Sequence, residues 1–241
     1  TAPGDIVEYS TDGTTWGSTL PTFTDVTDGE TVYVKVTNPN YAERNGNGIV
    51  KITPKAASVT PDNKSKTYGD ADPELTGTLV GFLAGDGVTA TYSRVAGENV
   101  GDYAISAELS PTGALSNYEI TYNEGTFTIA KRAITVTADA KTKAFGEGDP
   151  ELTYEITSGD LVGSDTFTGT LERVVGENVG TYAINQGTLA LSGNYTLTYV
   201  GALLTITPAD GKELDITDYE GVYDGAPHSI TIDNLIDGDG V

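Results

Sequence analysis

Two acidic stretches at matching places are the residues best suited to chemistry. Residues 68–76 carry carboxylates at alternate positions, and residues 145–153 repeat the pattern 77 positions later. Carboxylates spaced in this way in a loop could share a calcium ion with backbone carbonyl groups. The alternative is an Asp-Pro turn with hydrated acids, because the glycine and distal bidentate glutamate of an EF-type loop are absent. The candidate calcium ligands are Asp70, Asp72, Glu74, Glu147, Asp149 and Glu151.

Catalytic constellations are poorly supported. His228 is the only histidine, and its neighbour Ser229 would point to the opposite face of a strand, so a Ser-His pair is excluded and a turn role is favoured. Glu98 and Glu177 occupy equivalent positions in two repeats, whereas a glycosidase pair must share one site. We therefore predict no catalytic residue, no cofactor-binding residue and no enzymatic activity.

A tyrosine follows a glycine-bounded turn in both repeats. Residues 97–101 predict a turn that leads into a strand carrying Tyr103, and Tyr182 has the same place in the second copy. This arrangement resembles a tyrosine corner, in which the phenol closes on the backbone. We interpret both tyrosines as structural.

The elements that must position these residues are repeated. The block at residues 94–105 returns at 173–184, 79 positions later, and the pair Asn117-Tyr118 returns at Asn194-Tyr195, 77 positions later. Such a repeat defines the folding unit. We predict complete modules at residues 55–131 and 132–208.

Short alternating segments separated by Gly, Pro, Asn and Asp predict an all-β fold. Phe127 and Ile129 should face inward, and no segment has an apolar stripe at helical spacing. Strands are predicted at 56–60, 76–80, 88–93, 101–107, 117–122 and 125–130 of the first module. This spacing is typical of an immunoglobulin-like β-sandwich. The modules follow one another without a Gly/Ser-rich or Pro-rich spacer, which predicts tandem sandwiches arranged end to end as a rod.

The terminal segments are interpreted as partial modules. Asn40-Tyr41 precedes Asn117-Tyr118 by 77 positions, so residues 1–54 match the back part of a module. Residues 209–241 match a front part, and the two segments together have about the length of one module.

Composition limits the class of protein. The chain has 241 residues, 35 acidic and 13 basic side chains, a net charge of −22, and neither cysteine nor methionine. Without cysteine there is no disulfide or thiolate chemistry. The acidity disfavours nucleic acid and anionic membranes as partners, and no apolar run is long enough to span a membrane. The absence of methionine predicts a piece of a longer protein.

The motif Tyr-Gly-x-x-Asp-Pro-Glu-Leu at residues 68–75 resembles the MBG module of the YGX type. The later Gly-x-Tyr-x-Ile strand and the Asn-Tyr pair support the resemblance, although Phe145 replaces the tyrosine in the second copy. Residues 223–229 and 9–16 resemble parts of the sister YDG-type bacterial Ig-like module. The resemblance implies a secreted or wall-attached bacterial surface protein of the adhesin-like class.

Three functions remain open. The first is a non-enzymatic stalk that projects a distal function. The second is a module that binds glycan or mucin through aromatic side chains such as Tyr92 or Tyr154. The third is head-to-tail self-assembly, in which the terminal half modules of neighbouring copies complete each other by strand complementation.

Overall fold

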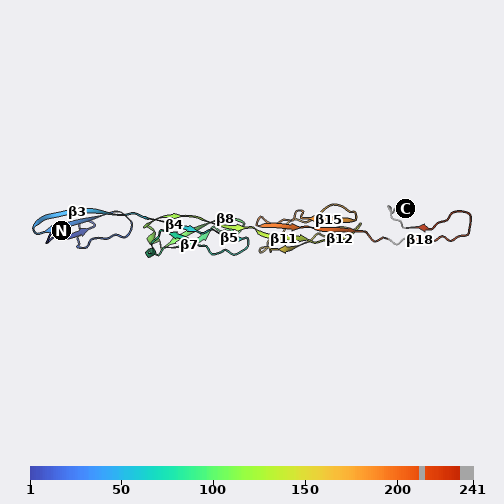
Figure 1. The fold of residues 1–241 in the computed structure, drawn as a ribbon, viewed down its shortest axis with the longest axis horizontal. Helices are drawn as coiled ribbons and strands as arrows, with labels where there is room; N and C mark the ends of the chain where they lie inside the picture. Colours follow the sequence, from blue (N-terminus) through green and yellow to red (C-terminus); the bar gives the residue numbers. More distant parts are fainter. Residues whose placement is uncertain (212–214, 234–241) are drawn as a thin grey trace. The chain divides into compact units, whose positions relative to one another are not determined.

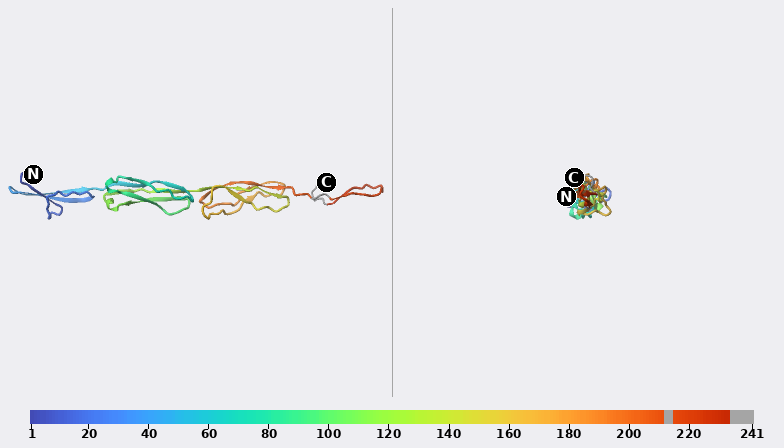
Figure 2. Two further views of the ribbon diagram at one scale, coloured as in Figure 1. Left: turned by 90° about the horizontal axis from the view of Figure 1, so that it is seen from below. Right: turned by 90° about the vertical axis from the view of Figure 1, so that its right-hand side faces the viewer.

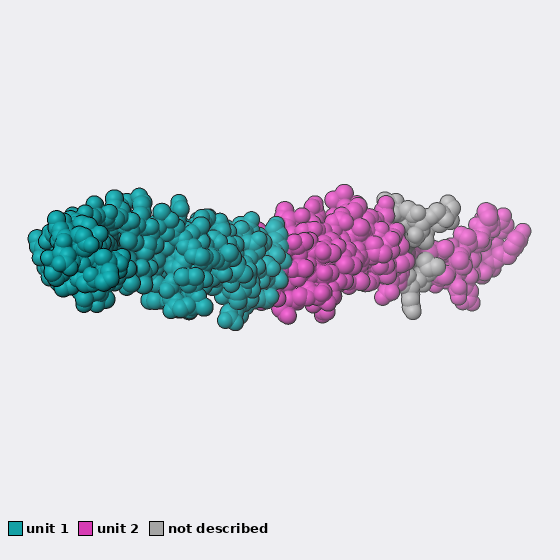
Figure 3. Space-filling model, turned by 60° about the vertical axis from the view of Figure 1, so that its left-hand side comes forward, with its two compact units in different colours: residues 1–131 teal, residues 132–241 magenta. Residues whose placement is uncertain are grey.

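The computed structural model describes residues 1–211 and 215–233. The chain divides into two compact units, Thr1–Lys131 and Arg132–Val241 (Figure 3). Within the described residues, the only helical elements are the short helices η1 (Ala84–Asp86) and α1 (Thr112–Leu115). The all-β fold built from repeated modules is therefore confirmed (Figure 1).

The first unit begins with a three-stranded antiparallel sheet of order β1-β2-β3, which we call the N-terminal sheet. Its strands are β1 (Ile6–Ser10), β2 (Thr27–Asn38) and β3 (Tyr41–Ile52). Strict alternation places Val32, Val34 and Val36 on one face of β2, and of these only Val32 is buried.

The first module has two sheets, coloured cyan to green in Figure 2. One has the order β6-β4-β9 and the other β5-β10-β8-β7. Each contains one parallel pair, β4 with β9 and β5 with β10. The strands are β4 (Lys55–Pro61), β5 (Lys64–Thr67), β6 (Gly77–Val80), β7 (Thr89–Arg94), β8 (Gly101–Ser110), β9 (Tyr118–Tyr122) and β10 (Gly125–Ala130).

The second module repeats this topology strand by strand. Its sheets have the orders β13-β11-β16 and β12-β17-β15-β14. The parallel pairs are again β11 with β16 and β12 with β17. The strands are β11 (Arg132–Ala138), β12 (Lys141–Ala144), β13 (Tyr154–Ser158), β14 (Glu172–Arg173), β15 (Gly180–Asn185), β16 (Tyr195–Val200) and β17 (Ala202–Thr207).

Each module has its own core between its sheets. In β10 the burial alternates residue by residue, so Phe127 and Ile129 are buried while Thr126 and Thr128 are exposed. Ile105 of β8 packs with these two side chains. The corresponding buried residues of the second module include Ile184, Leu204 and Ile206. Period-two alternation therefore places the apolar side chains correctly without help from helices.

All six predicted strands of the first module are present, with ends that differ by at most three residues from the predicted ones. The structure adds a strand that was not predicted, β5. Strand β5 reads Lys-Ser-Lys-Thr and has no apolar residue. It exists because its backbone pairs in parallel with β10. A polar strand of this kind leaves no periodic signal in the sequence.

Residues beyond β17 are exposed where the structure describes them. Strands β18 (Ile216–Thr217) and β19 (Thr231–Ile232) form a two-stranded sheet, and every residue from 215 to 233 is exposed. Residues 212–214 and 234–241 of the predicted partial module lie outside the described residues. In the described part of the chain, no helix is long and apolar enough to cross a membrane.

Candidate functional site

The acidic stretch of each module is a turn that follows the polar strand. In the first module it begins at Tyr68, whose amide donates to the carbonyl of Ala130 at 2.9 Å, just after β5. The next residue, Gly69, has a φ of 86°, and Gly146 of the second module has a φ of 87°. Glycine reaches this backbone region without steric cost, which explains why the motif carries it in both copies.

The carboxylate of Asp72 is held by two cations. Arg94 binds it in a bidentate manner, with Nε at 2.5 Å and Nη2 at 3.1 Å from its oxygens. Lys66 Nζ lies 2.7 Å from the same carboxylate and also pairs with Glu98. Arg94 Nη2 closes the ring of contacts at 2.6 Å from Glu98. We call Lys66, Asp72, Arg94 and Glu98 the ion-pair cluster of the first module.

The same ion-pair cluster recurs in the second module, from Lys143, Asp149, Arg173 and Glu177. Lys143 Nζ lies 2.7 Å from Asp149 and 2.6 Å from Glu177. Arg173 Nε lies 2.6 Å from Asp149, and its Nη2 also pairs with Glu177. The lysine side chains are only 4% and 3% exposed in the two copies. A lysine buried to this extent requires an opposite charge, and each cluster supplies two.

The clusters shift the pKa values of their acids downward. Arg94 first, and then Lys66, lowers the pKa of Asp72 to about 2. Arg173 and Lys143 do the same for Asp149, also to about 2. Each cluster therefore consists of two cations and two ionised carboxylates at neutral pH. Neutral clusters of this kind tie loops together and offer no unpaired acid or base for catalysis.

The model of the MBG domain (YGX type) matches the chain at residues 57–128 and at residues 134–205, which together are more than half of its length. The chain belongs to the MBG (YGX-type) domain family. MBG domains are a non-catalytic module type found in bacterial surface proteins. A comparison with curated proteins found no match.

The two matches lie within the predicted modules 55–131 and 132–208. The finer boundaries, and the assignment of residues 1–54 and 209–241 to YDG-type partial modules, stay predictions. Phe145, which replaces Tyr68 in the second MBG module, keeps the equivalent backbone bond, since its amide donates to Thr207 at 2.8 Å. The side-chain difference is therefore tolerated by the turn.

The predicted calcium ligands have separate roles in the MBG turns. Asp72 and Asp149 bind lysine and arginine, and Glu147 accepts the amide of Ala144 at 2.8 Å. Glu74 and Glu151 are exposed, and Asp70 lies at the start of its turn with its amide bonded to Thr67. Among residues 1–211 and 215–233, no three acidic or histidine side chains form a group that could hold a metal ion. Calcium binding stays a prediction without geometric support.

Both tyrosine corners are confirmed. The Tyr103 hydroxyl donates to the carbonyl of Asn99 at 2.8 Å, and Tyr182 donates to Asn178 at the same distance. The guanidinium of Arg94 lies 5.5 Å from the centre of the Tyr103 ring. The corner and the ion-pair cluster thus share one loop in each MBG module.

The other residues considered for catalysis, His228, Glu98 and Glu177, also form contacts with neighbouring side chains. His228 Nε2 lies 2.8 Å from Asp224, and its ring stacks on Tyr219 with centroids 4.2 Å apart. The expected turn is at residues 225–226, where Asp224 accepts the amide of Ala226 at 2.9 Å, and His228 lies two residues beyond it. Glu98 and Glu177 each pair with the lysine and arginine of their own module.

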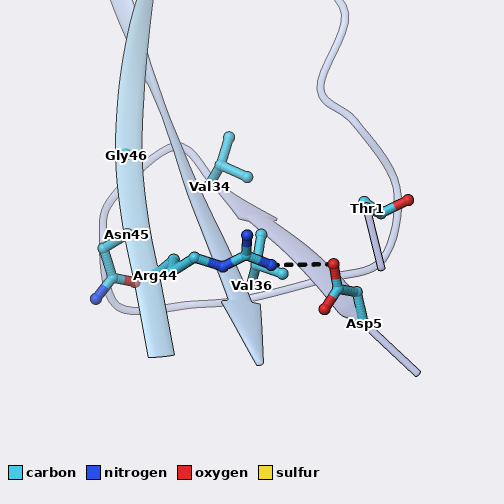
Figure 4. A pocket seen from close by; sticks show the side chains of 7 residues that line it. All are labelled: Thr1, Asp5, Val34, Val36, Arg44, Asn45 and Gly46. Atoms are coloured by element: carbon cyan, nitrogen blue, oxygen red, sulfur yellow. Dashed lines mark hydrogen bonds and ion pairs between the residues drawn. The ribbon is translucent and has the colours of Figure 1, made fainter. Parts of the chain in front are cut away.

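One pocket with both polar and apolar lining residues lies on the N-terminal sheet. It has a volume of about 300 Å³ and is lined by Val34 and Val36 of β2 and by Arg44 of β3, among others (Figure 4). Arg44 pairs with Asp5 across its mouth at 3.0 Å. Gly46 gives β3 no side chain here, and a Cβ on it would meet nothing within 4 Å. Val34 and Val36 are half-buried at this pocket, whereas Val32 of the same face is buried.

The cations of the ion-pair clusters were not predicted as site residues. Arg94 and Arg173 stand at the start of the repeated block, and their recurrence was the available signal. Lys66 and Lys143 lie in the polar strands β5 and β12, where nothing in the local sequence indicates burial. Only the tertiary structure brings these residues to the acidic turn.

Proposed function

We propose that this chain is a non-enzymatic spacer of a bacterial cell-surface protein. Its tandem modules would form an extended, secreted or wall-attached stalk. The joints between modules carry this proposal. Strand β3 ends at Ile52 and β4 begins at Lys55, while β10 ends at Ala130 and β11 begins at Arg132. In each joint, the two strands belong to different sheets and are separated by only one or two residues. Connections this short cannot act as flexible linkers.

The interior of each module also supports a mechanical role. The charged groups of the ion-pair clusters are committed to one another, and the tyrosine corners close on the backbone. In such a module the polar side chains stabilise loops. A net charge of −22 adds repulsion that favours solubility and extension.

Small-angle X-ray scattering on the full chain tests the spacer proposal. We expect a pair-distance distribution with the cross-section of a single module and a long tail. The tail should persist at high salt, because short joints restrict bending independently of charge. A compact envelope at physiological salt would overturn the proposal.

Self-assembly is a second candidate, and the exposed apolar side chains of residues 215–233 favour it. Residues 215–233 include strongly exposed apolar side chains, such as Val222 at 89% and Tyr223 at 94% exposed. We propose that this segment of one copy covers Val34 and Val36 of another. Strand complementation of this kind buries apolar surface and pairs open sheet edges at once.

Sedimentation velocity over a concentration series tests self-assembly. The full chain should form growing oligomers, and Val34→Glu should abolish them by placing a charge in the pocket that the proposed contact covers. The matched control Thr91→Glu adds the same charge to an exposed position of β7. Monomers at every concentration would refute this candidate.

Binding of glycan or mucin stays a third proposal with less support. Tyr92 packs against the core cluster of the first module, and burial raises its pKa. Tyr154 packs edge-on against Phe167 with ring centroids 5.2 Å apart. Both rings are half-buried, which reduces the aromatic surface available for stacking on a sugar. A glycan array probed with the full chain would revive the proposal if it gave a saturable hit.

A further inference from the structure

The two residues of the repeated Asn-Tyr pair make different hydrogen bonds. The tyrosine acts inside its own module. The Tyr118 hydroxyl accepts the amide of Leu83 at 2.9 Å and donates to Asp86. Tyr195 accepts the amide of Val162 at 2.9 Å and donates to Asp165 at 2.6 Å. The tyrosine therefore closes the same loop in both modules.

The asparagine of the first pair acts across a joint. Asn117 Oδ1 accepts the amide of Val26 at 2.8 Å, and its Nδ2 donates to Asp25 Oδ1 at 2.8 Å. Asp25 and Val26 immediately precede β2 of the N-terminal sheet. The backbone carbonyl of Asn117 accepts the amide of Lys55, the first residue of β4, at 3.0 Å. Asn117 thus lies where the chain enters the first module.

The joint has little dry packing to hold it. A pocket of about 400 Å³ separates its two sides and is lined by Asp25, Ile52, Leu83 and Asn117, among others. Leu83 is 55% exposed, so apolar side chains do not seal the joint. The two side-chain hydrogen bonds of Asn117 are specific polar contacts across this joint.

We propose that Asn117 locks the N-terminal sheet onto the first module and sets the stiffness of this joint. Only a primary amide offers a donor and an acceptor in this fork. An aspartate would keep the acceptor, lose the donor and face the carboxylate of Asp25. The proposal deepens the spacer function and rests on it for its purpose, since a stalk is only as stiff as its joints.

Two measurements on the full chain test the lock in Asn117→Ala. The first is hydrogen exchange at the Val26 amide, which the asparagine protects directly. The second is the distance distribution between spin labels on Thr19→Cys and Ser106→Cys, both exposed positions. The labels attach only there because the chain has no cysteine.

We expect Val26 to exchange about tenfold faster in Asn117→Ala and the distance distribution to broaden. The matched control is Asn123→Ala, which removes a side-chain bond to Thr60 inside the same module. It should change neither measurement. Unchanged protection of the Phe127 amide will show that the module stays folded in both variants.

Unchanged exchange at Val26, or an unchanged width of the distribution, would overturn the lock. The outcome is separable from that of the spacer proposal. An extended scattering profile with an unaffected joint rejects the lock alone. A compact profile with a joint that loosens in Asn117→Ala rejects the spacer alone.

Discussion

The ring of Tyr103 occupies the space that a side chain at position 97 would need. A Cβ added to Gly97 would lie 2.2 Å from Cε1 of this ring, and one added to Gly176 would lie 2.1 Å from Tyr182. Such contacts cannot form without movement of the ring or the backbone. The glycine of the repeated turn is thus required by its tyrosine.

Gly97→Ala should destabilise the first module by about 1–3 kcal/mol, because the tyrosine corner must open. Gly113→Ala is the matched control. It lies in the same module, and its added Cβ would meet nothing within 4 Å. The stability of the first module in both variants is measured by chemical denaturation, with hydrogen exchange at the Phe127 amide as the probe. Equal stabilities would show that the corner adjusts without cost.

At the scale of elements, the ion-pair cluster joins strand β5 and the acidic turn that follows it to the end of β7, which is 22 positions further along the chain. Strand β5 supplies Lys66, the acidic turn supplies Asp72, and the end of β7 supplies Arg94. Arg94 Nη1 also donates to the carbonyls of Val95 and Gly97, at 3.0 and 2.7 Å. The arginine therefore orders the loop that holds the tyrosine corner.

Arg94→Lys should cost about 1–3 kcal/mol although it keeps the charge, because lysine cannot reproduce the bidentate and carbonyl contacts. The measurement is the denaturant midpoint of the first module. Glu119→Gln, which changes an exposed charge in β9, should shift this midpoint by less than about 0.5 kcal/mol. A lysine variant as stable as the parent would show that charge alone suffices.

The pKa values of the clusters predict acid sensitivity. The pKa of Asp72 and of Asp149 is about 2 in the folded chain, below the ordinary value of 3.8. Their ion pairs therefore contribute stability above about pH 4, and this contribution is lost as the pH falls toward 2. Tm measured from pH 7 to pH 2 should fall mainly in this window.

The double variant Asp72→Asn and Asp149→Asn checks the source of that fall. It should have a lower Tm at pH 7 and a shallower decline between pH 4 and 2. An unchanged slope would assign the acid sensitivity to other carboxylates.

Calcium should leave the stability of the chain almost unchanged. At Asp72 the ion would have to displace Lys66 and Arg94, and the same holds at Asp149. We expect Tm in millimolar calcium to equal that in chelator. A rise in Tm that Glu74→Gln and Glu151→Gln remove would instead establish the calcium site predicted from the acidic stretches.

At the scale of the whole molecule, charge is the dominant property. The net charge is −22 at pH 7 and the isoelectric point is about 4.1. Repulsion of this size opposes non-specific association near neutrality and disappears at the isoelectric point.

We therefore expect a solubility minimum near pH 4 in low salt, which reverses on return to pH 7. Light scattering across the pH range measures it, with circular dichroism as the control for retained strand structure. Constant scattering down to pH 4 would mean that net charge does not govern association of this chain.

The repeated modules and their all-β character could be predicted from local patterns in the sequence. A repeat of 77 positions and the alternation around Phe127 are local patterns, and strand burial follows directly from them. The structural role of Tyr103 was also readable, because its glycine-bounded turn lies only a few residues away.

The role of the acidic stretches in ion pairs depends on contacts between strands and could not be predicted from the local sequence. Strand β5 has no apolar residue, and its existence depends on pairing with β10, about 60 residues later. That pairing buries Lys66 beside Asp72, while β7 brings Arg94 to the same place. Arg94 lies 22 positions from Asp72, and Lys66 lies in a strand whose sequence does not indicate burial. The local sequence therefore shows the carboxylates without the cations that bind them, which is why it suggested calcium.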